Sequence, residues 1–368
     1  MPASTPRGGR GALHESEPRP WMTAGKPESQ GVRSTSLRPL CDRGQPQNAP
    51  VSQAAAHFHL PSSILYSAAV QFRKITIVGV GLLGGSLGLA IKRRRLAKSV
   101  AGFVRRASSV AECEKGGAVD LATRDLREAV SGAELIILCT PLLQMRALVR
   151  RMVPMLKPGA ILTDVGSVKG SVVRELEPAV HKAGAYFVGS HPMAGSEKTG
   201  VSAARADLFV DAVCVVTPTK RTDPAALRKI ERFWKAVGGR LLRMTPELHD
   251  ALAGRSSHLP HIAAVTLANL VLDPGNPRHQ AALCANGFRD TTRIASGSPE
   301  MWRDIALTNR RNLARALAAF IGDLEKFRRA LNKADAKAIA GILERAKQRR
   351  DSWSARSASP SPEWEGEN

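Results

Sequence analysis

Aromatic residues and closely spaced cysteines are scarce in this sequence, and it has no long apolar run. Only 4% of its 368 residues are aromatic, and the 5 cysteines are odd in number and widely separated along the chain. Cysteines in this arrangement predict neither a disulfide framework nor a metal site. The apolar runs, such as residues 135–143, are far shorter than the roughly 18 residues that span a membrane. We therefore expect a cytoplasmic protein without a metal or a membrane partner.

Negative charge is also under-represented. The chain has 54 Lys and Arg residues against 32 Asp and Glu, a formal net charge of +22. Such an excess is typical of nucleic-acid-binding proteins, whose cations neutralise phosphates. Here the basic residues are spread over the whole chain without a nucleic-acid-binding motif, which favours a solvated basic surface and no nucleic-acid partner. The same positive field would attract an anionic substrate or a phosphorylated cofactor.

The two ends of the chain lack a hydrophobic pattern. Residues 1–70 are rich in Pro, Gly, Ser, Gln and Arg, so we expect a disordered N-terminal arm. Its alternatives are a targeting segment, against which its acidic residues argue, and an over-long gene start. Residues 354–368 are short, polar and proline-containing, and we expect a disordered tail there.

Between these ends, the sequence predicts two domains. From residue 74 to 245, short β-rich runs alternate with helical stretches, the pattern of a doubly wound parallel sheet of the Rossmann type. The expected strands are residues 75–78, 100–104, 135–139, 160–163, 186–188 and 212–217. Residues 246–350 instead carry apolar residues at helical spacing. The fold class is therefore α/β, with an all-helical C-terminal domain.

A glycine-rich turn follows the first expected strand and opens a helix. Its spacing, Gly79-x-Gly81-x-x-Gly84, is the fingerprint of dinucleotide-binding proteins. The glycines permit a tight turn, a close approach to the pyrophosphate and close packing of helix on strand, while the helix N-terminus faces the phosphates. The cofactor-binding residues expected here are Gly79, Val80, Gly81, Leu82, Leu83 and Gly84.

The end of the second expected strand bears on the choice of cofactor. An acidic residue there usually binds the adenosine ribose of NAD, but this chain has Arg105 and Arg106. Two guanidinium groups would instead bind a 2′-phosphate, which favours NADP over NAD. The alternative is that both arginines only face solvent at the start of a helix.

Polar residues follow three further expected strands. Thr140 and Pro141, Ser167, and His191 come after or beside successive β-rich runs, so parallel strands would bring them to one edge of the sheet. Thr140 and Pro141 are expected to support the cofactor, although they also suit an ordinary helix start. A histidine accepts a proton near neutral pH and a serine can orient it, which suits the removal of a hydroxyl proton as hydride leaves.

In this order the motifs resemble those of the prephenate/arogenate dehydrogenase family over residues 74–350. Beside the glycine turn, the resemblance rests on four motifs that start at Asp164, Gly189, Ser257 and Phe288: DxGSVK, GSHPxAGxE, SHLPH and FRDxTRIA. It implies oxidative decarboxylation of prephenate or arogenate in tyrosine biosynthesis, with hydride transfer to NAD(P)+ and without a metal. It also implies a homodimer formed through the helical domain.

The resemblance assigns roles to single residues. His191 is expected to be the base on the ring hydroxyl, with Ser167 beside it, and Arg293 is expected to hold a substrate carboxylate. The remaining expected substrate-binding residues are His258, His261, Ser196, Glu197 and Arg289, with Trp302 as a weaker candidate.

Other interpretations of these residues remain open. His258 and His261 could be core histidines, Arg293 could pair with Asp290 on one helix face, and Glu197 could only cap a helix. For the whole chain, the alternatives are another two-domain NAD(P)-dependent hydroxy-acid dehydrogenase and a basic nucleotide-binding protein without enzyme activity.

Overall fold

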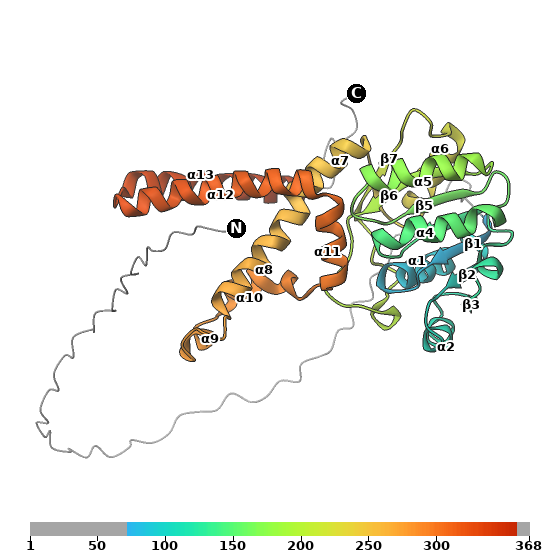
Figure 1. Ribbon diagram of the computed structural model, residues 1–368, viewed down its shortest axis with the longest axis horizontal. Helices are drawn as coiled ribbons and strands as arrows, with labels where there is room; N and C mark the ends of the chain where they lie inside the picture. Colours follow the sequence, from blue (N-terminus) through green and yellow to red (C-terminus); the bar gives the residue numbers. More distant parts are fainter. Residues whose placement is uncertain (1–71, 359–368) are drawn as a thin grey trace, which may run out of the picture. The chain divides into compact units, whose positions relative to one another are not determined.

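The structure is a computed structural model that describes residues 72–358 (Figure 1). The N-terminal arm expected at residues 1–70 lies outside the described residues. So does the part of the expected tail from residue 359 onward. Within the described residues, strands and helices alternate up to Arg243, and only helices follow from Pro246.

The strands form one sheet in the order β3-β2-β1-β4-β5-β6-β7-β8. Their bounds are β1 (Phe72–Val78), β2 (Ala97–Phe103), β3 (Leu121–Thr123), β4 (Leu135–Leu138), β5 (Ile161–Asp164), β6 (Tyr186–Pro192), β7 (Val213–Thr217) and β8 (Arg240–Arg243). The chain order reverses between β1 and β4, and ligands bind at such a switch point in doubly wound folds.

The sheet differs from the expected one at its far edge. β7 runs antiparallel to β6, with His191 opposite Val215, so the expectation of a wholly parallel sheet is wrong there. A β7 parallel to β6 would need a crossover connection between the two strands, usually a helix. The β6–β7 link, residues 193–212, has only the short 3-10 turn Val201–Ala203. The sequence analysis also missed β3 and β8, which are only 3 and 4 residues long.

Helices cover both faces of the sheet. On one face α1 (Leu82–Arg93), α2 (Ser108–Lys115) and α6 (Pro224–Ala236) contribute to an apolar core, and on the other α3 (Leu126–Val130), α4 (Leu142–Met152) and α5 (Gly170–Lys182) do so. Alternate residues of the central strands enter opposite cores: Ile137 packs with the first set and Ile136 with the second. Because both faces are buried, the central strands are continuously apolar.

The C-terminal part is helical, as expected. It contains α7 (Pro246–Ala253), a π-helical turn (Gly254–His258), α8 (Leu259–Val271), α9 (His279–Ala282), α10 (Asn286–Thr292), a 3-10 turn (Arg293–Ser296), α11 (Pro299–Thr308), α12 (Arg310–Asn332) and α13 (Ala336–Ala358). None of the described helices is both long enough and apolar enough to cross a membrane.

The last helix extends further than the sequence suggested. The tail was expected from residue 354, but α13 continues to Ala358. Lys347 pairs with Asp351 one turn later at 2.7 Å, and the Arg350 guanidinium lies 4.7 Å from the centre of the Trp353 ring. Such contacts between residues three or four apart stabilise an exposed helix, and a search for apolar period alone does not detect them.

Replacing Gly84 with alanine is expected to destabilise the protein. A β-carbon at this position would lie 2.1 Å from the Gly79 carbonyl oxygen, so α1 would have to move away from β1. We expect the free energy of unfolding, measured by urea denaturation, to fall by about 1–3 kcal/mol. Gly81→Ala is the matched control, because its β-carbon would meet no described atom within 4 Å. Equal losses in the two variants would contradict this account of the turn.

Candidate active site

The turn between β1 and α1 has the geometry that a dinucleotide phosphate requires. Gly79 has a φ of +97°, which favours glycine, and its N–H bonds the Phe103 carbonyl at 3.0 Å. No side chain caps the N-terminus of α1, and its first turn holds no acidic residue. The backbone N–H groups there are therefore available to an anion, and the space beside Gly81 is open among the described residues.

Thr140 lies beside this turn, at the switch point of the sheet. Its methyl carbon is 2.8 Å from where a β-carbon of Gly79 would stand. Its hydroxyl is buried and has no hydrogen-bond partner among the described residues, while Pro141 precedes the first residue of α4. Buried hydroxyls rarely remain unpaired, so a bound polar group would satisfy Thr140. Together these features fit a nicotinamide dinucleotide.

Arg105 and Arg106 lie directly after β2, in the turn before α2. Both side chains are exposed, and no ion pair within residues 72–358 involves either of them. They are therefore free to bind an external anion, although they remain equally compatible with a solvated helix start.

A buried ion pair builds the loop that carries Ser167. Lys169, which is fully buried, donates to the Asp164 carboxylate and, at 2.7 Å, to the Ser190 carbonyl. Asp164 also accepts from the Gly166 N–H at 2.9 Å. The pair thus joins the end of β5 and its following loop to Ser190, the residue before His191. Ser167 lies in this loop and is partly exposed.

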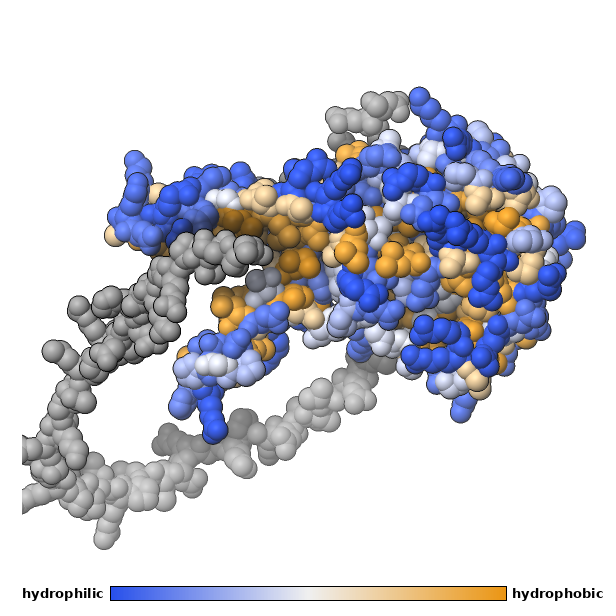
Figure 2. Space-filling model, viewed as in Figure 1, coloured by the Kyte–Doolittle hydropathy of each residue, from blue (hydrophilic) through white to orange (hydrophobic). Residues whose placement is uncertain are grey.

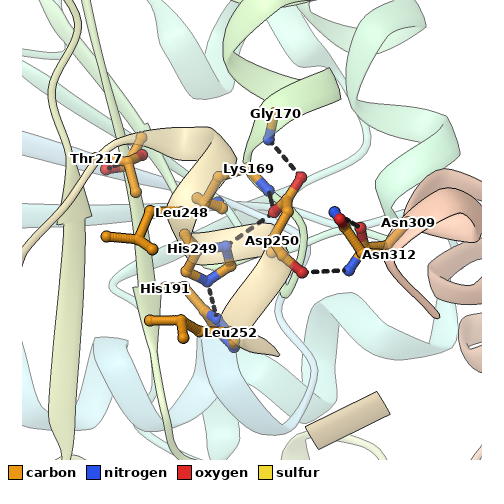
Figure 3. Close-up of polar contacts among 12 residues, drawn as sticks. Lys169, Gly170, His191, Thr217, Leu248, His249, Asp250, Leu252, Asn309 and Asn312 are labelled. Carbon is orange, nitrogen blue, oxygen red and sulfur yellow. Dashed lines mark hydrogen bonds and ion pairs between the residues drawn. The ribbon is translucent and has the colours of Figure 1, made fainter. Parts of the chain in front are cut away.

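His191 is the first of three side chains joined by hydrogen bonds. It lies inside β6, because this strand continues past residue 188, where the expected strand ended, and it is 7% exposed. Its Nδ1 is 2.8 Å from Nε2 of His249, whose Nδ1 is 2.9 Å from Oδ1 of Asp250 (Figure 3). Both of these partners come from α7, so this helix holds His191 through its Nδ1 atom.

Asp250 has further partners that hold it in place. Its Oδ1 accepts from the Lys169 N–H at 2.7 Å, and its Oδ2 accepts from the Gly170 N–H at 2.8 Å (Figure 3). The Asn309 side chain donates to its backbone carbonyl at 2.8 Å. Asp250 therefore caps the N-terminus of α5, which has no side-chain cap of its own.

The surroundings of His191 favour its neutral form. Burial, and then the neighbouring His249, Lys169 and His258, hold its pKa well below the usual value. An imidazole that is neutral at physiological pH can accept a proton, which is the state that a general base requires.

His258 and His261 form a buried wall with Trp302. The rings of His261 and Trp302 are stacked, with centroids 3.4 Å apart and planes within 7°. Nδ1 of His258 is 3.1 Å from the Asn309 amide, and burial lowers the pKa of His258 to about 4. Nδ1 of His261 is buried without a hydrogen-bond partner among the described residues. Nε2 of His258 also lacks a partner within hydrogen-bond distance, although the Ser167 backbone lies near enough to oppose the lowering of the His258 pKa. One nitrogen of each histidine is therefore available to a polar ligand.

Arg293 pairs with the loop that follows β6. Its guanidinium donates to the Glu197 carboxylate at 2.8 Å, an ion pair between residues 96 positions apart. No contact with Asp290 is found within residues 72–358, so the same-helix alternative is not favoured. Ser196 accepts a turn hydrogen bond from the Lys198 N–H at 3.2 Å. Arg289 is exposed on α10 and reaches only Asn286, at 3.5 Å, so no described contact brings it to the other candidates.

The sequence analysis missed four residues of this cluster: Lys169, His249, Asp250 and Asn309. Lys169 stood in a quoted motif but was given no role. Adjacent His249 and Asp250 were a usable signal, because a carboxylate beside a histidine commonly orients it. Their partner His191 is 58 residues away, so only the fold identifies the contact.

Comparisons with family models and with known proteins agree on one family. The family model for the prephenate dehydrogenase nucleotide-binding domain matches residues 87–243, and that for the prephenate dehydrogenase dimerization domain matches residues 245–345. The cyclohexadienyl dehydrogenase of Zymomonas mobilis is 35% identical over 266 residues, covering 72% of this chain and 90% of that protein.

Two solved structures are similar along nearly their whole length. The prephenate dehydrogenase of Aquifex aeolicus, in complex with hydroxyphenyl propionate and NAD+, aligns with a TM-score of 0.72 at 32% identity, covering 76% of this chain and 98% of that one. The arogenate dehydrogenase of Synechocystis aligns with a TM-score of 0.64 at 31% identity, covering 76% and 99%.

Lys169→Met is expected to destabilise the protein strongly. The substitution would leave the fully buried Asp164 carboxylate without its cation, and breaking a buried pair in this way costs about 3–5 kcal/mol. Thermal and urea unfolding measure the loss. Lys182→Met, on the exposed end of α5, is the matched control and should change stability by less than about 0.5 kcal/mol. A stable Lys169→Met protein would show that the pair does not hold this loop.

Proposed function

This chain belongs to the prephenate dehydrogenase family, and we propose that it performs that family's reaction with the residues described above. It is a dehydrogenase that oxidises and decarboxylates prephenate or arogenate on the route to tyrosine, with NAD(P)+ as the hydride acceptor. The observation that best supports the residue roles is the buried His191 at the carboxyl edge of the sheet, with its pKa held below the usual value and its Nδ1 hydrogen-bonded to His249.

The β1–α1 turn and Thr140 would hold the cofactor. The backbone N–H groups at the start of α1 would bind the pyrophosphate, and the unpaired Thr140 hydroxyl would bond the ribose or the carboxamide. Bound in this way, the nicotinamide ring supplies the hydride acceptor. The protein's own contribution is to align the substrate and to move one proton.

His191 takes up and returns that proton. As the hydride leaves C4 of the substrate ring, the hydroxyl proton passes to Nε2 of His191 and the C4–O bond becomes a carbonyl. The C1–carboxylate bond then breaks, and its electron pair passes through the ring to that oxygen. Carbon dioxide leaves, the ring becomes aromatic, and the phenolate oxygen recovers the proton from His191. No net proton is consumed, which suits a base buried away from water.

The helical domain would supply the substrate contacts. Arg293 can form two parallel hydrogen bonds to a substrate carboxylate, and its pairing with Glu197 keeps it beside the loop after β6. The unpaired nitrogens of His258 and His261 would bond the remaining oxygens. Prephenate and arogenate share the ring and both carboxylates, so these contacts serve either substrate.

We further propose that NADP is the preferred cofactor. Arg105 and Arg106 are exposed after β2, and no carboxylate in the turn repels a 2′-phosphate. The Aquifex protein was solved with NAD+, so this chain would differ from that relative in its cofactor.

The helical domain also supports a homodimer. Large apolar side chains on α8 and α12 are exposed, including Leu270 at 70% and Ile321 at 55%. Figure 2 shows apolar surface gathered where these two helices lie. A second copy would bury this surface, in agreement with the family model that describes the domain as a dimerization domain.

Spectrophotometry at the reduced-nicotinamide band tests the activity and the role of His191 together. Wild-type protein should reduce cofactor with prephenate or arogenate, and His191→Asn should lower kcat by about 10²- to 10⁴-fold while it still binds cofactor. Because burial holds the His191 pKa below its usual value of about 6.5, the base stays neutral, and kcat/KM should stay on its plateau below that pH. Near-normal turnover of the variant would remove His191 from this role.

The Arg105→Ala/Arg106→Ala double variant tests the cofactor preference. Loss of two charged donors to the 2′-phosphate should raise KM for NADP by about 10-fold or more and leave KM for NAD nearly unchanged. Steady-state kinetics with each cofactor measures both constants. Arg232→Ala is the control, because Arg232 is exposed on α6, which packs on β6 and β8. A parallel change for both cofactors would contradict the assignment.

A further inference from the structure

We propose that His249 is a positioning residue of this dehydrogenase: backed by Asp250, it fixes the tautomer of His191 and shares the positive charge that His191 acquires. The inference rests on the proposed function, because it concerns the same base. It assigns a task to a pair of residues on α7 that the reaction described above does not use.

The hydrogen-bond chain determines which nitrogen of His191 carries the proton. The Asp250 carboxylate only accepts, so Nδ1 of His249, 2.9 Å away, must donate to it. A neutral His249 then has a lone pair on Nε2, which can only accept from Nδ1 of His191, 2.8 Å away. His191 is therefore protonated on Nδ1. Its Nε2 is left with the lone pair that a base needs.

The direction of this chain depends on Asp250 staying a pure acceptor. Two backbone N–H groups, from Lys169 and Gly170, donate to its two oxygens at 2.7 and 2.8 Å. Both oxygens already accept from backbone donors, which leaves no orientation in which Asp250 could donate. The start of α5 thereby sets the direction in which the hydrogen bonds from His191 through His249 to Asp250 are donated.

The same hydrogen bonds to His249 and Asp250 stabilise His191 once it has taken the proton. His191, His249 and Asp250 are 7%, 2% and 7% exposed, so water screens the new charge poorly. The other charged or titratable groups around them are Lys169, Asp164, His258 and His261, and Asp164 is already paired with Lys169. Asp250 is the anion joined to His191 through hydrogen bonds. As Nε2 gains the substrate proton, the Nδ1 proton can shift toward His249, and it returns when the phenolate recovers its proton.

Two amide variants of His249 separate this role from a structural one. Asparagine can still donate to Asp250 but is too short to reach His191, whereas glutamine can place an acceptor oxygen where Nε2 of His249 lies. We expect His249→Asn to lower kcat by about 10- to 100-fold with KM changed by less than about threefold. His249→Gln should recover at least about 10-fold of that loss, because it restores the acceptor for Nδ1 of His191.

Controls separate loss of positioning from loss of fold. His181→Asn changes a histidine at the end of α5 that packs against Tyr186, and it should leave kcat and KM unchanged. Thermal unfolding and reduced-cofactor fluorescence show whether each variant is folded and binds cofactor.

Two results would overturn the inference: wild-type kcat in His249→Asn, or equal losses in the asparagine and glutamine variants. Inactivity of the wild-type protein with every substrate and cofactor pair would instead refute the proposed function itself, so the two failures are distinguishable.

Discussion

The cap that Asp250 places on the start of α5 is the interaction on which the rest of the site depends. The first backbone N–H groups of a helix lack partners within the helix, and α5 has no side-chain cap of its own. Asp250, 80 residues further along the chain, accepts two hydrogen bonds from this helix start. Satisfying these donors docks α7 against the sheet and brings His249 to His191, so a folding requirement also arranges the proposed catalytic residues.

Almost every buried charge of the described site has an opposite charge or a backbone donor as its partner. Lys169 is matched by Asp164 and Asp250 by backbone donors, as buried ions require. The histidines stay neutral because burial lowers the pKa of His191, His258 and His261. Under the proposed function, a neutral pocket inside a protein of net charge +22 would attract anionic substrates while His191 stays unprotonated.

Local signals in the sequence were sufficient for the family and for most of the fold. The glycine turn after β1 and the apolar runs of the central strands are such signals, and the family and the α/β class with its helical C-terminal domain are confirmed. The 3-residue strand β3 and the arginine-flanked β8 carry too few apolar residues to be recognised. The contact between His249 and His191 depends on how α7 packs, which no local pattern encodes. The roles of His191, Ser167 and Arg293 stay predictions.

The unexpected antiparallel strand explains why His191 can be held so firmly. β6 pairs with β5 only as far as Val188, opposite Thr163, and continues past the end of β5 to Pro192. β7 supports this extension by pairing with Gly189 through Pro192. The side of β6 that β5 leaves free therefore faces the loop with Ser167, while the other side is fixed by backbone hydrogen bonds. A parallel β7 would need a crossover helix between residues 193 and 212, where the loop with Glu197 now pairs with Arg293. The reversal of one strand thus places His191, the proposed base, on a rigid element, and it leaves the adjoining loop for the proposed substrate contacts.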